Sequence, residues 1–228
     1  MIEHKHTDVA VVGAGAAGVG VGVALDTVDV DVTLIDRAGV GASFRQWPDE
    51  MRFITPSYPS NAFGLPDLNA IVPQTSPGIA LNRQQPSGPE YARYLEAIVK
   101  HHELPVESDC EVRGVEYVAE TDTDQESAVT ADGGTTRSEQ FFLETSEGTI
   151  TSEFLVWAGG QFSTPRTDLS PGADWCLHNS TVASWVDHAA QSSTDQFLVV
   201  GGFESGIDAA VSLLELGCSV TVLDRGYP

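Results

Sequence analysis

The sequence predicts an α/β protein built on two similar strand–turn–helix–strand units. The prediction rests on a glycine-rich pattern that occurs twice, with its first glycines, Gly13 and Gly201, 188 residues apart. In each copy an apolar run precedes the glycines and a helical run follows them. Each copy also places an acid, Asp36 or Asp224, 23 positions after its first glycine. This arrangement is typical of a turn that holds an ADP moiety, so we expect two nucleotides, a flavin and a nicotinamide.

In the first unit the three glycines have separate tasks. Gly13 permits a tight bend, Gly15 lets the backbone approach a pyrophosphate, and Gly18 lets the helix lie close to the strand. The pyrophosphate would meet the N–H groups at the helix N-terminus, where the helix dipole favours negative charge. Asp36 would accept hydrogen bonds from the ribose hydroxyls. The alternative is a glycine-rich turn without a ligand.

The second unit departs from this pattern at one position. Phe203 stands where the first unit has its middle glycine. A side chain there is expected to push the backbone away from a bound pyrophosphate unless the loop is reshaped. Asp224 favours the free ribose of NAD(H), whereas Arg225 can pair with the extra phosphate of NADP(H). The sequence leaves the choice open, and a packed unit without a ligand stays an alternative.

Charge limits the partners of the chain. Its 228 residues include 33 acidic and 11 basic side chains, which gives a formal net charge of -22. Nucleic acid and anionic membrane surfaces would be repelled, so neither is expected as a partner. The acids are spread along the chain and only two lysines occur, which resembles proteins of salt-loving archaea. An ordinary acidic mesophilic protein is the alternative.

The cysteine spacing argues against a disulfide-stabilised or metal-binding protein, and the length of the longest apolar run argues against a membrane-spanning helix. Cys110, Cys176 and Cys218 form no CxxC pair, disulfide framework or metal-ligand spacing. We therefore expect buried reduced thiols in a cytoplasmic protein and no metal site. Residues 10–25 are almost wholly apolar, but this run is too short to span a bilayer.

Local patterns predict the elements around the first turn. Residues 8–12 and 31–36 read as parallel strands, with a helix from 16 to about 26 between them. Residues 39–86 are dense in Pro, Ser, Asn and aromatic residues, so they are predicted to be a functional loop-rich segment. A capping-box signature at 87–90 then opens a helix that runs to about residue 102.

Strand signals dominate the next part of the chain. Residues 106–118 supply one or two strands, and residues 120–139 read as an exposed acidic loop. Residues 141–145 and 149–151 form a predicted hairpin, which a buried strand over 154–158 follows.

Three motifs between and around the turns carry a resemblance to a known superfamily. The run Gly41-Ala42-Ser43-Phe44-Arg45 looks like a GGxWR motif, Phe154 to Gly160 looks like an ATG segment, and Gly201 to Ala210 looks like a GGxESGxDAA motif. Together they resemble the two-dinucleotide-binding flavoprotein superfamily. That superfamily includes flavin-containing monooxygenases, thioredoxin reductase-like enzymes and bacillithiol disulfide reductase-like proteins.

The resemblance implies an FAD-dependent oxidoreductase that uses NAD(P)H to reduce the flavin, which then reduces a small-molecule substrate or oxygen. It implies a Rossmann-like FAD-binding domain with a β-meander and the start of a second Rossmann-like domain for NAD(P). No catalytic residue can be assigned. The cofactor-binding residues expected on this basis are Gly13, Gly15, Ala16, Ala17, Gly18, Asp36, Arg37, Ser43, Phe44, Trp47, Val112, Ala158, Gly159, Gly201, Gly202, Glu204, Ser205, Gly206, Asp224 and Arg225.

Departures from the superfamily leave two alternatives open. The chain lacks the CxxC pair of thioredoxin reductases, which disfavours electron relay through an intrinsic disulfide. His178 keeps the histidine of a monooxygenase fingerprint without its spacing, and a structurally bonded histidine is the favoured reading. A flavin-dependent monooxygenase and a non-catalytic nucleotide-binding protein therefore remain alternatives.

The segment 47–57 directly follows the FAD-type loop and has two interpretations. Its aromatic residues could cover the flavin ring, with Arg45 or Arg52 steadying negative charge on it. Alternatively, Phe53 and its aromatic neighbours fill the core beneath a long loop.

The predicted domains follow from the order of these motifs. Residues 1–160 are expected to form the FAD-binding domain, with the loop-rich segment 39–86 and the hairpin region 106–152 inside it. A crossing segment covers 161–195, and 196–228 would be a partial NAD(P)-binding domain. The sequence stops four residues after Asp224, so we expect an incomplete second domain, with a complementing C-terminal segment or a homo-oligomer as the expected partner.

Overall fold

The computed structural model describes residues 4–28, 30–58, 67–118, 140–161, 165, 167 and 171–226. The chain divides into two compact units, one made of Met1–Ala42 with Leu95–Gly160 and the other of Ser43–Tyr94 with Gln161–Pro228. The predicted domain boundaries stay predictions. In the described part of the chain, no helix has the length and apolar character needed to cross a bilayer.

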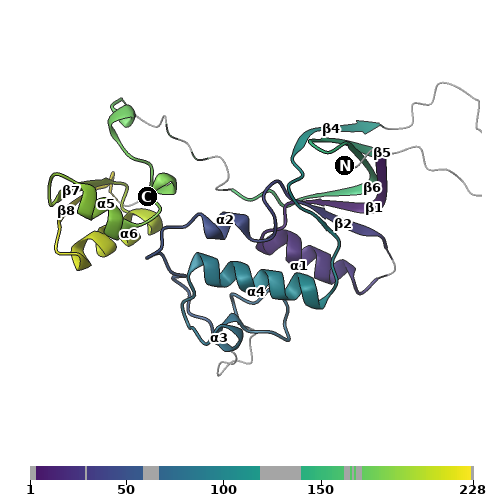
Figure 1. Cartoon of the computed structure of the whole chain (residues 1–228), viewed down its shortest axis with the longest axis horizontal. Coiled ribbons are helices and arrows are strands. Elements are labelled where there is room, and N and C mark those ends of the chain that lie inside the picture. The colour runs from purple at the N-terminus through teal and green to yellow at the C-terminus, as the bar shows by residue number, and fades with distance from the viewer. Residues whose placement is uncertain are drawn as a thin grey trace, which may run out of the picture. The chain divides into compact units, whose positions relative to one another are not determined.

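A six-stranded sheet organises the first unit (Figure 1), with the strand order β3-β2-β1-β6-β5-β4. Strands β1, β2, β3 and β6 run parallel, whereas β4, β5 and β6 form an antiparallel meander. The strands are β1 (His4–Val12), β2 (Val32–Ile35), β3 (Val106–Glu107), β4 (Val112–Val118), β5 (Gln140–Thr145) and β6 (Thr149–Trp157). The predicted α/β class with a parallel sheet and a hairpin is confirmed.

Helix α1 (Ala16–Leu25) packs on β1 and β2 because its glycines allow a close approach. A Cβ on Gly22 would lie 3.0 Å from a Leu34 methyl carbon. A core cluster of side chains that are at most 8% exposed lies within the sheet. It consists of Ala10, Val12, Ile35, Cys110, Leu143 and Ile150.

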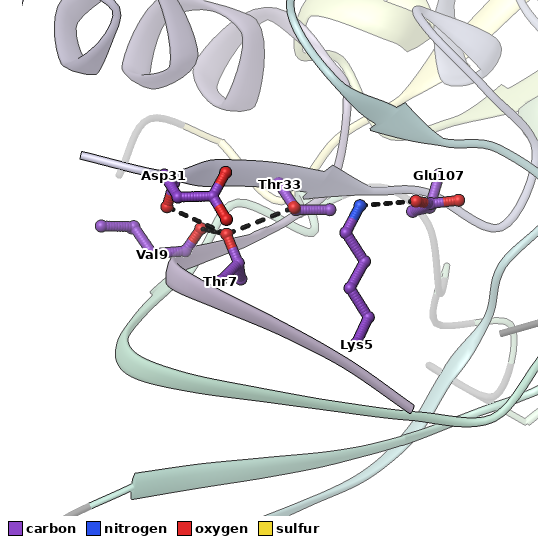
Figure 2. A network of polar contacts seen from close by, with 6 residues as sticks. All are labelled: Lys5, Thr7, Val9, Asp31, Thr33 and Glu107. Carbon is purple, nitrogen blue, oxygen red and sulfur yellow. Dashed lines mark hydrogen bonds and ion pairs between the residues drawn. The ribbon is translucent and has the colours of Figure 1, made fainter. Parts of the chain in front are cut away.

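Polar side chains join the N-terminal halves of the parallel strands (Figure 2). The Thr7 hydroxyl donates to the Asp31 carbonyl over 2.9 Å, and the Thr33 hydroxyl donates to the Thr7 hydroxyl over 3.2 Å. Thr7 and Thr33 are both fully buried. Nearby, Lys5 Nζ lies 2.7 Å from Glu107 Oε1 and links β1 to β3. These contacts satisfy buried polar groups and oppose a slip in strand register.

The second unit contains the loop-rich segment and the second nucleotide-type unit. Strands β7 (Gln196–Val200) and β8 (Ser219–Leu223) pair in parallel around α6 (Glu204–Glu215). Their core is Val182, Trp185, Ala209 and Leu213. The unit also contains α2 (Ala42–Arg45, which starts one residue before it), α3 (Pro77–Ala80), η1 (Ala173–Trp175), η2 (Asn179–Thr181), α5 (Trp185–Gln191) and the first half of the helix after α3.

Helix α4 (Gly88–His101) begins with the predicted capping box. The Ser87 amide donates to Glu90 Oε2 over 2.8 Å, and the Glu90 amide donates to Ser87 Oγ over 3.3 Å. The predicted apolar face is confirmed, because its four residues are at most 5% exposed. They are Tyr91, Tyr94, Leu95 and Ile98.

Two predictions are wrong at least in part, and a third concerns residues that the structure does not describe. Strand β6 is continuous, and its C-terminal half is not buried: Phe154 is 56% and Trp157 65% exposed, because β5 pairs only with residues 149–152 of it. Of the three cysteines expected to be buried, only Cys110 is: Cys176, which follows the short turn η1, is exposed, and Cys218 is partly exposed. The predicted acidic loop 120–139 lies outside the described residues.

Candidate functional site

The carboxyl ends of three neighbouring parallel strands meet at one edge of the six-stranded sheet. Gly13 follows β1, Asp36 follows β2 and Ala158 follows β6. The Gly13 amide donates to the Ile35 carbonyl over 2.8 Å, and the Ala158 amide donates to the Val12 carbonyl over 2.7 Å. The sheet thereby gathers three predicted site residues that lie far apart in sequence. Ligands of open α/β sheets bind outside such carboxyl ends.

The turn after β1 is tight at two glycines and open at the third. Gly13 has φ +109°, and a Cβ on it would lie 2.3 Å from the Ala158 carbonyl oxygen. A Cβ on Gly18 would lie 1.8 Å from the Gly13 carbonyl oxygen. By contrast, a Cβ placed on Gly15 would meet no atom of the described residues within 4 Å, apart from Gly15 itself and its two chain neighbours. The first two glycines are therefore required by packing, and the space beside Gly15 is available to a ligand.

The N-terminus of α1 is suited to an anionic group. Gly15 is its N-cap, with φ -79° and ψ -168°, and as a glycine it has no side chain that could accept from the first N–H groups of the helix. Ala16 and Ala17 are the first helical residues, and their small side chains do not screen the backbone N–H groups. The residues present fit a nucleotide pyrophosphate.

Asp36 holds the turn through its carboxylate. Its Oδ2 accepts from the Ala14 amide over 2.8 Å, and its Oδ1 accepts from the Ala38 amide over 2.9 Å. Each carboxylate oxygen has two acceptor sites, so these contacts still leave capacity for ribose hydroxyls. Asp36 therefore supports the turn in addition to the predicted ribose contact, a role that the sequence did not indicate.

Three further predicted residues of this unit lie in different surroundings. Arg37 follows Asp36 and is exposed. Gly159 follows β6, where a Cβ would lie 3.2 Å from the Trp157 ring nitrogen. Val112 begins β4 and packs against the buried cluster of the sheet. A structural role explains the placement of Val112, and its contact with a cofactor stays a prediction.

The second turn has a backbone conformation similar to that of the first, although a Cβ on Gly201, unlike one on Gly13, would meet no atom of the described residues beyond its chain neighbours within 4 Å. The Gly201 amide donates to the Leu223 carbonyl over 2.8 Å, and Gly201 has φ +104°. A Cβ on Gly206 would lie 1.9 Å from the Gly201 carbonyl oxygen. Glu204, Ser205 and Gly206 form the first turn of α6, and Asp224 directly follows β8 with Arg225 next to it. The two units thus share one backbone design.

Phe203 does not reshape the second loop. It is the N-cap of α6, with φ -99° and ψ -176°, which is the same extended conformation that Gly15 adopts. Its side chain is 80% exposed. The loop is thus not reshaped, and the expected effect of this side chain on a bound pyrophosphate stays a prediction. The phenyl group projects from the position where Gly15 leaves open space.

The FAD-type loop begins in the first compact unit with Gly41 and Ala42, and its residues from Ser43 onward belong to the second compact unit. Phe44 packs between Trp47, Phe53 and Tyr91, with ring centroids 5.3, 6.0 and 4.9 Å away. Ser43 precedes this cluster and is exposed. The packing supports the reading in which these aromatic residues fill the core beneath the loop, and their contact with a flavin stays a prediction.

Sequence reasoning missed helix α5 and the residue that caps it. The Glu50 carboxylate accepts hydrogen bonds from the Ser184 hydroxyl and from the Trp185 and Val186 amides. Burial opposes its charge, but these hydrogen bonds together lower the pKa of Glu50. Ser184 with Asp187 three positions later is a helix-start signal that predicts α5. Nothing in the sequence points to Glu50.

The structure also locates the remaining candidate. His178 Nδ1 accepts from the Ser180 amide over 3.2 Å and caps η2, which confirms a structurally bonded histidine. In the described part of the chain, no group of three or more His, Cys, Asp or Glu residues could hold a metal ion.

Comparisons with known proteins agree with this geometry. Residues 10–228 match the family model described as pyridine nucleotide-disulphide oxidoreductase. Bacilliredoxin reductase Bdr of Bacillus subtilis (strain 168) is 32% identical over 91 residues, which cover 40% of this chain and 27% of that protein.

Solved structures share the fold along nearly the whole chain. A flavin-containing monooxygenase from Stenotrophomonas maltophilia matches with a TM-score of 0.70 and 16% identity, over 98% of this chain and 59% of that one. The bacillithiol disulfide reductase Bdr (YpdA) from Staphylococcus aureus matches with a TM-score of 0.62 and 18% identity, over 98% of this chain and 58% of that one. The chain thus spans less than two thirds of these proteins. With 219 of its 228 residues (10–228) matched by the family model, the chain belongs to the pyridine nucleotide-disulphide oxidoreductase family.

Proposed function

We propose that the protein is a cytoplasmic oxidoreductase that binds FAD at the first turn and NAD(P)H at the second. The observation that carries this proposal is the repeated turn: Gly13 and Gly201 have similar positive φ values, and a Cβ on Gly18 or Gly206 would clash with the carbonyl of the first glycine of its own turn. Bound FAD would take a hydride from the nicotinamide and pass electrons to a small-molecule substrate or to oxygen.

The residues of the two turns bind the nucleotides and orient them. The open side of Gly15 and the N-terminus of α1 receive the pyrophosphate of FAD, while Asp36 accepts from the ribose hydroxyls. At the second turn, Asp224 and Arg225 decide between the free ribose of NADH and the phosphate of NADPH. Their placement after β8 is compatible with both nucleotides.

Reconstitution of the full chain tests the proposal. The chain is mixed with FAD in molar potassium chloride, which screens its net charge of -22, and free flavin is removed. We expect retained flavin absorbance and a loss of that absorbance in Asp36→Ala. NADH and NADPH oxidation are then measured separately. Absence of both flavin retention and nucleotide oxidation would exclude the proposal.

Product analysis separates a reductase from a monooxygenase. A reductase oxidises one NAD(P)H for each two-electron reduction of its substrate and does not require oxygen. A monooxygenase consumes oxygen and leaves one of its atoms in the product. The resemblance of Gly41 to Arg45 to a GGxWR motif keeps the second outcome under test.

A second candidate function is nucleotide binding without turnover, and the exposed Phe203 side chain favours it. This ring projects from the helix N-terminus at which a nicotinamide nucleotide would bind. Phe203→Gly is expected to strengthen NAD(P)H binding in calorimetry. Strong FAD binding without NAD(P)H oxidation in both the wild type and Phe203→Gly would support the non-catalytic function.

A further inference from the structure

A small pocket lies in the loop-rich segment beside the N-terminus of α4. It has a volume of about 250 Å³ and is lined by Arg52, Arg83, Gln85, Ser87 and Glu90. Two backbone contacts hold its walls together: Arg52 pairs with Ser87 in an antiparallel bridge, and the Phe53 amide donates to the Pro86 carbonyl over 3.1 Å. Backbone pairing between the loop segments around Arg52 and Ser87 therefore holds the pocket together.

The charge of this pocket is opposite to that of the chain. Acidic residues outnumber basic ones by 33 to 11, yet the lining holds two guanidinium groups and one carboxylate. A guanidinium presents paired N–H donors that match the oxygens of a carboxylate or a phosphate. The Gln85 amide and the Ser87 hydroxyl add neutral polar groups to the same lining.

Existing contacts orient the two arginines and leave donors for a ligand. Arg52 Nη1 donates to the carbonyls of Asp49 and Met51 over 2.6 and 2.8 Å, which fixes the guanidinium. Arg83 Nε lies 3.5 Å from Glu90 Oε1, and its side chain is 65% exposed. Because each guanidinium carries five N–H donors, these contacts do not exhaust either group.

Glu90 sets the net charge of the pocket. Its Oε2 accepts from the Ser87 amide, and this hydrogen bond is the main cause that lowers the pKa of the carboxyl, with Arg83 and Arg52 adding to it against the effect of burial. The carboxylate is therefore charged at neutral pH. It competes with an anion for Arg83, so its neutralisation should strengthen anion binding.

We propose that this pocket binds the carboxylate or phosphate group of a small molecule and, given the oxidoreductase function proposed above, that this molecule is the substrate. Its surroundings favour that role. Phe53 and Tyr91 follow Arg52 and Glu90 in sequence and belong to the aromatic cluster of the FAD-type loop. Arg52 also influences α6 of the second nucleotide unit, where its charge opposes the rise that burial causes in the pKa of Asp208.

Calorimetric titration of the full chain with inorganic phosphate and with succinate, at constant ionic strength, tests the site. Arg83→Ala is expected to weaken binding of at least one probe tenfold or more, and Glu90→Gln to strengthen it. Arg113→Ala is the matched control, because Arg113 is 57% exposed and its Nε lies 3.6 Å from Glu111. Equal effects of Arg83→Ala and Arg113→Ala, or no binding of either probe to the wild type, would overturn the proposal.

Two further measurements identify the source of the anion. Retained FAD absorbance in Arg83→Ala, together with unchanged KM values for NADH and NADPH, assigns the pocket to a substrate. A KM that rises for NADPH alone assigns it to the nucleotide phosphate and refutes the substrate role. If the chain binds no FAD but binds the probes through Arg83, the oxidoreductase proposal fails while the anion pocket stands. Unfolding curves of each variant confirm that the loop remains folded.

Discussion

The Glu50 carboxylate caps a helix that begins 135 residues later, with its Oε2 2.8 Å from the Trp185 amide nitrogen. The same carboxylate accepts from the Ser184 hydroxyl over 2.8 Å. The adjacent Asp49 amide donates to the Ala183 carbonyl over 2.9 Å. These contacts join the loop after the FAD-type motif to helix α5, within one compact unit.

Removal of this cap should destabilise the chain. Glu50→Ala leaves the Trp185 and Val186 amides without their acceptor, although the N-cap Ser184 remains, and is expected to lower the free energy of unfolding by about 1–2 kcal/mol. The lowered pKa of Glu50 means that its stabilisation is present above the unfolded pKa and is lost as pH falls through the folded pKa. Urea unfolding between pH 3 and pH 7 measures both effects. Glu50→Gln keeps one acceptor oxygen, so it should lose this pH dependence; a variant that keeps it would contradict the assignment.

The pKa of Asp208 is shifted in the opposite direction to that of Glu50. Burial and the nearby Glu50 raise its pKa, although Arg52 opposes them, and its Oδ2 is buried with no hydrogen-bond partner among the described residues. A raised folded pKa means that the unfolded chain ionises first, so stability is lost as pH rises above the unfolded value. Asp208→Asn should therefore raise Tm by about 2–4 °C at pH 7, a shift typical of roughly 1 kcal/mol in a chain of this size. Little change is expected at pH 3.

The control for Asp208 is Asp195→Asn, which removes the same charge from an exposed side chain. It should leave Tm within about 1 °C, since surface substitutions change stability by less than roughly 0.5 kcal/mol. Equal shifts for the two variants would show that the net charge of the chain, rather than burial at Asp208, governs the effect.

Glycines of the first turn should separate packing from ligand binding. The methyl group of Gly18→Ala would clash with the Gly13 carbonyl oxygen. This substitution should lower the free energy of unfolding by about 1–3 kcal/mol or more. The methyl group of Gly15→Ala would meet no atom of the described residues beyond its chain neighbours within 4 Å, and the φ of this position is an ordinary negative value, so the chain without FAD should be about as stable as the wild type. Its affinity for FAD should nevertheless fall. Flavin retention and urea unfolding of the two variants distinguish these effects, and a Gly15→Ala variant with unchanged FAD affinity would argue against pyrophosphate binding at this turn.

The two acids that end the nucleotide units, Asp36 and Asp224, should differ in their contribution to the stability of the fold. Asp36→Ala leaves the Ala14 and Ala38 amides without their acceptor and is expected to cost about 1–3 kcal/mol. Asp224→Ala alters an exposed side chain after β8 and should change stability by less than about 0.5 kcal/mol. Thermal unfolding without nucleotide makes the comparison, and a larger effect of Asp224→Ala would reverse the assignment.

Tyr91 combines aromatic packing with one buried hydrogen bond. Its hydroxyl donates to the Asn69 carbonyl over 2.7 Å, and the residue is 3% exposed. Tyr91→Phe should cost about 1 kcal/mol, because the ring packing remains and only the hydrogen bond is lost. Burial is the main cause that raises the pKa of Tyr91, so its phenol should ionise only on unfolding. Tyr58→Phe, at an exposed position, is the control and should have no measurable effect on stability.

Local sequence patterns determined both nucleotide-type units. The apolar runs before Gly13 and Gly201, and the acids that end the units, predicted strands, turns and helices that the structure confirms. Such patterns succeed because strand ladders, tight glycine turns and helix caps depend on neighbouring residues. The capping box at Ser87 and Glu90 was predictable for the same reason.

Tertiary structure alone decided the features that depend on distant partners. The cap from Glu50 to α5, the exposed half of β6 and the arginine pocket each depend on which segments the fold brings together. At Phe203 the sequence showed a change of residue, but only the structure shows that the backbone keeps the conformation of Gly15 and turns the ring outward. The physical reason is that local hydrogen bonding and periodicity specify an element, whereas side-chain burial and long-range hydrogen bonds are settled when the elements pack.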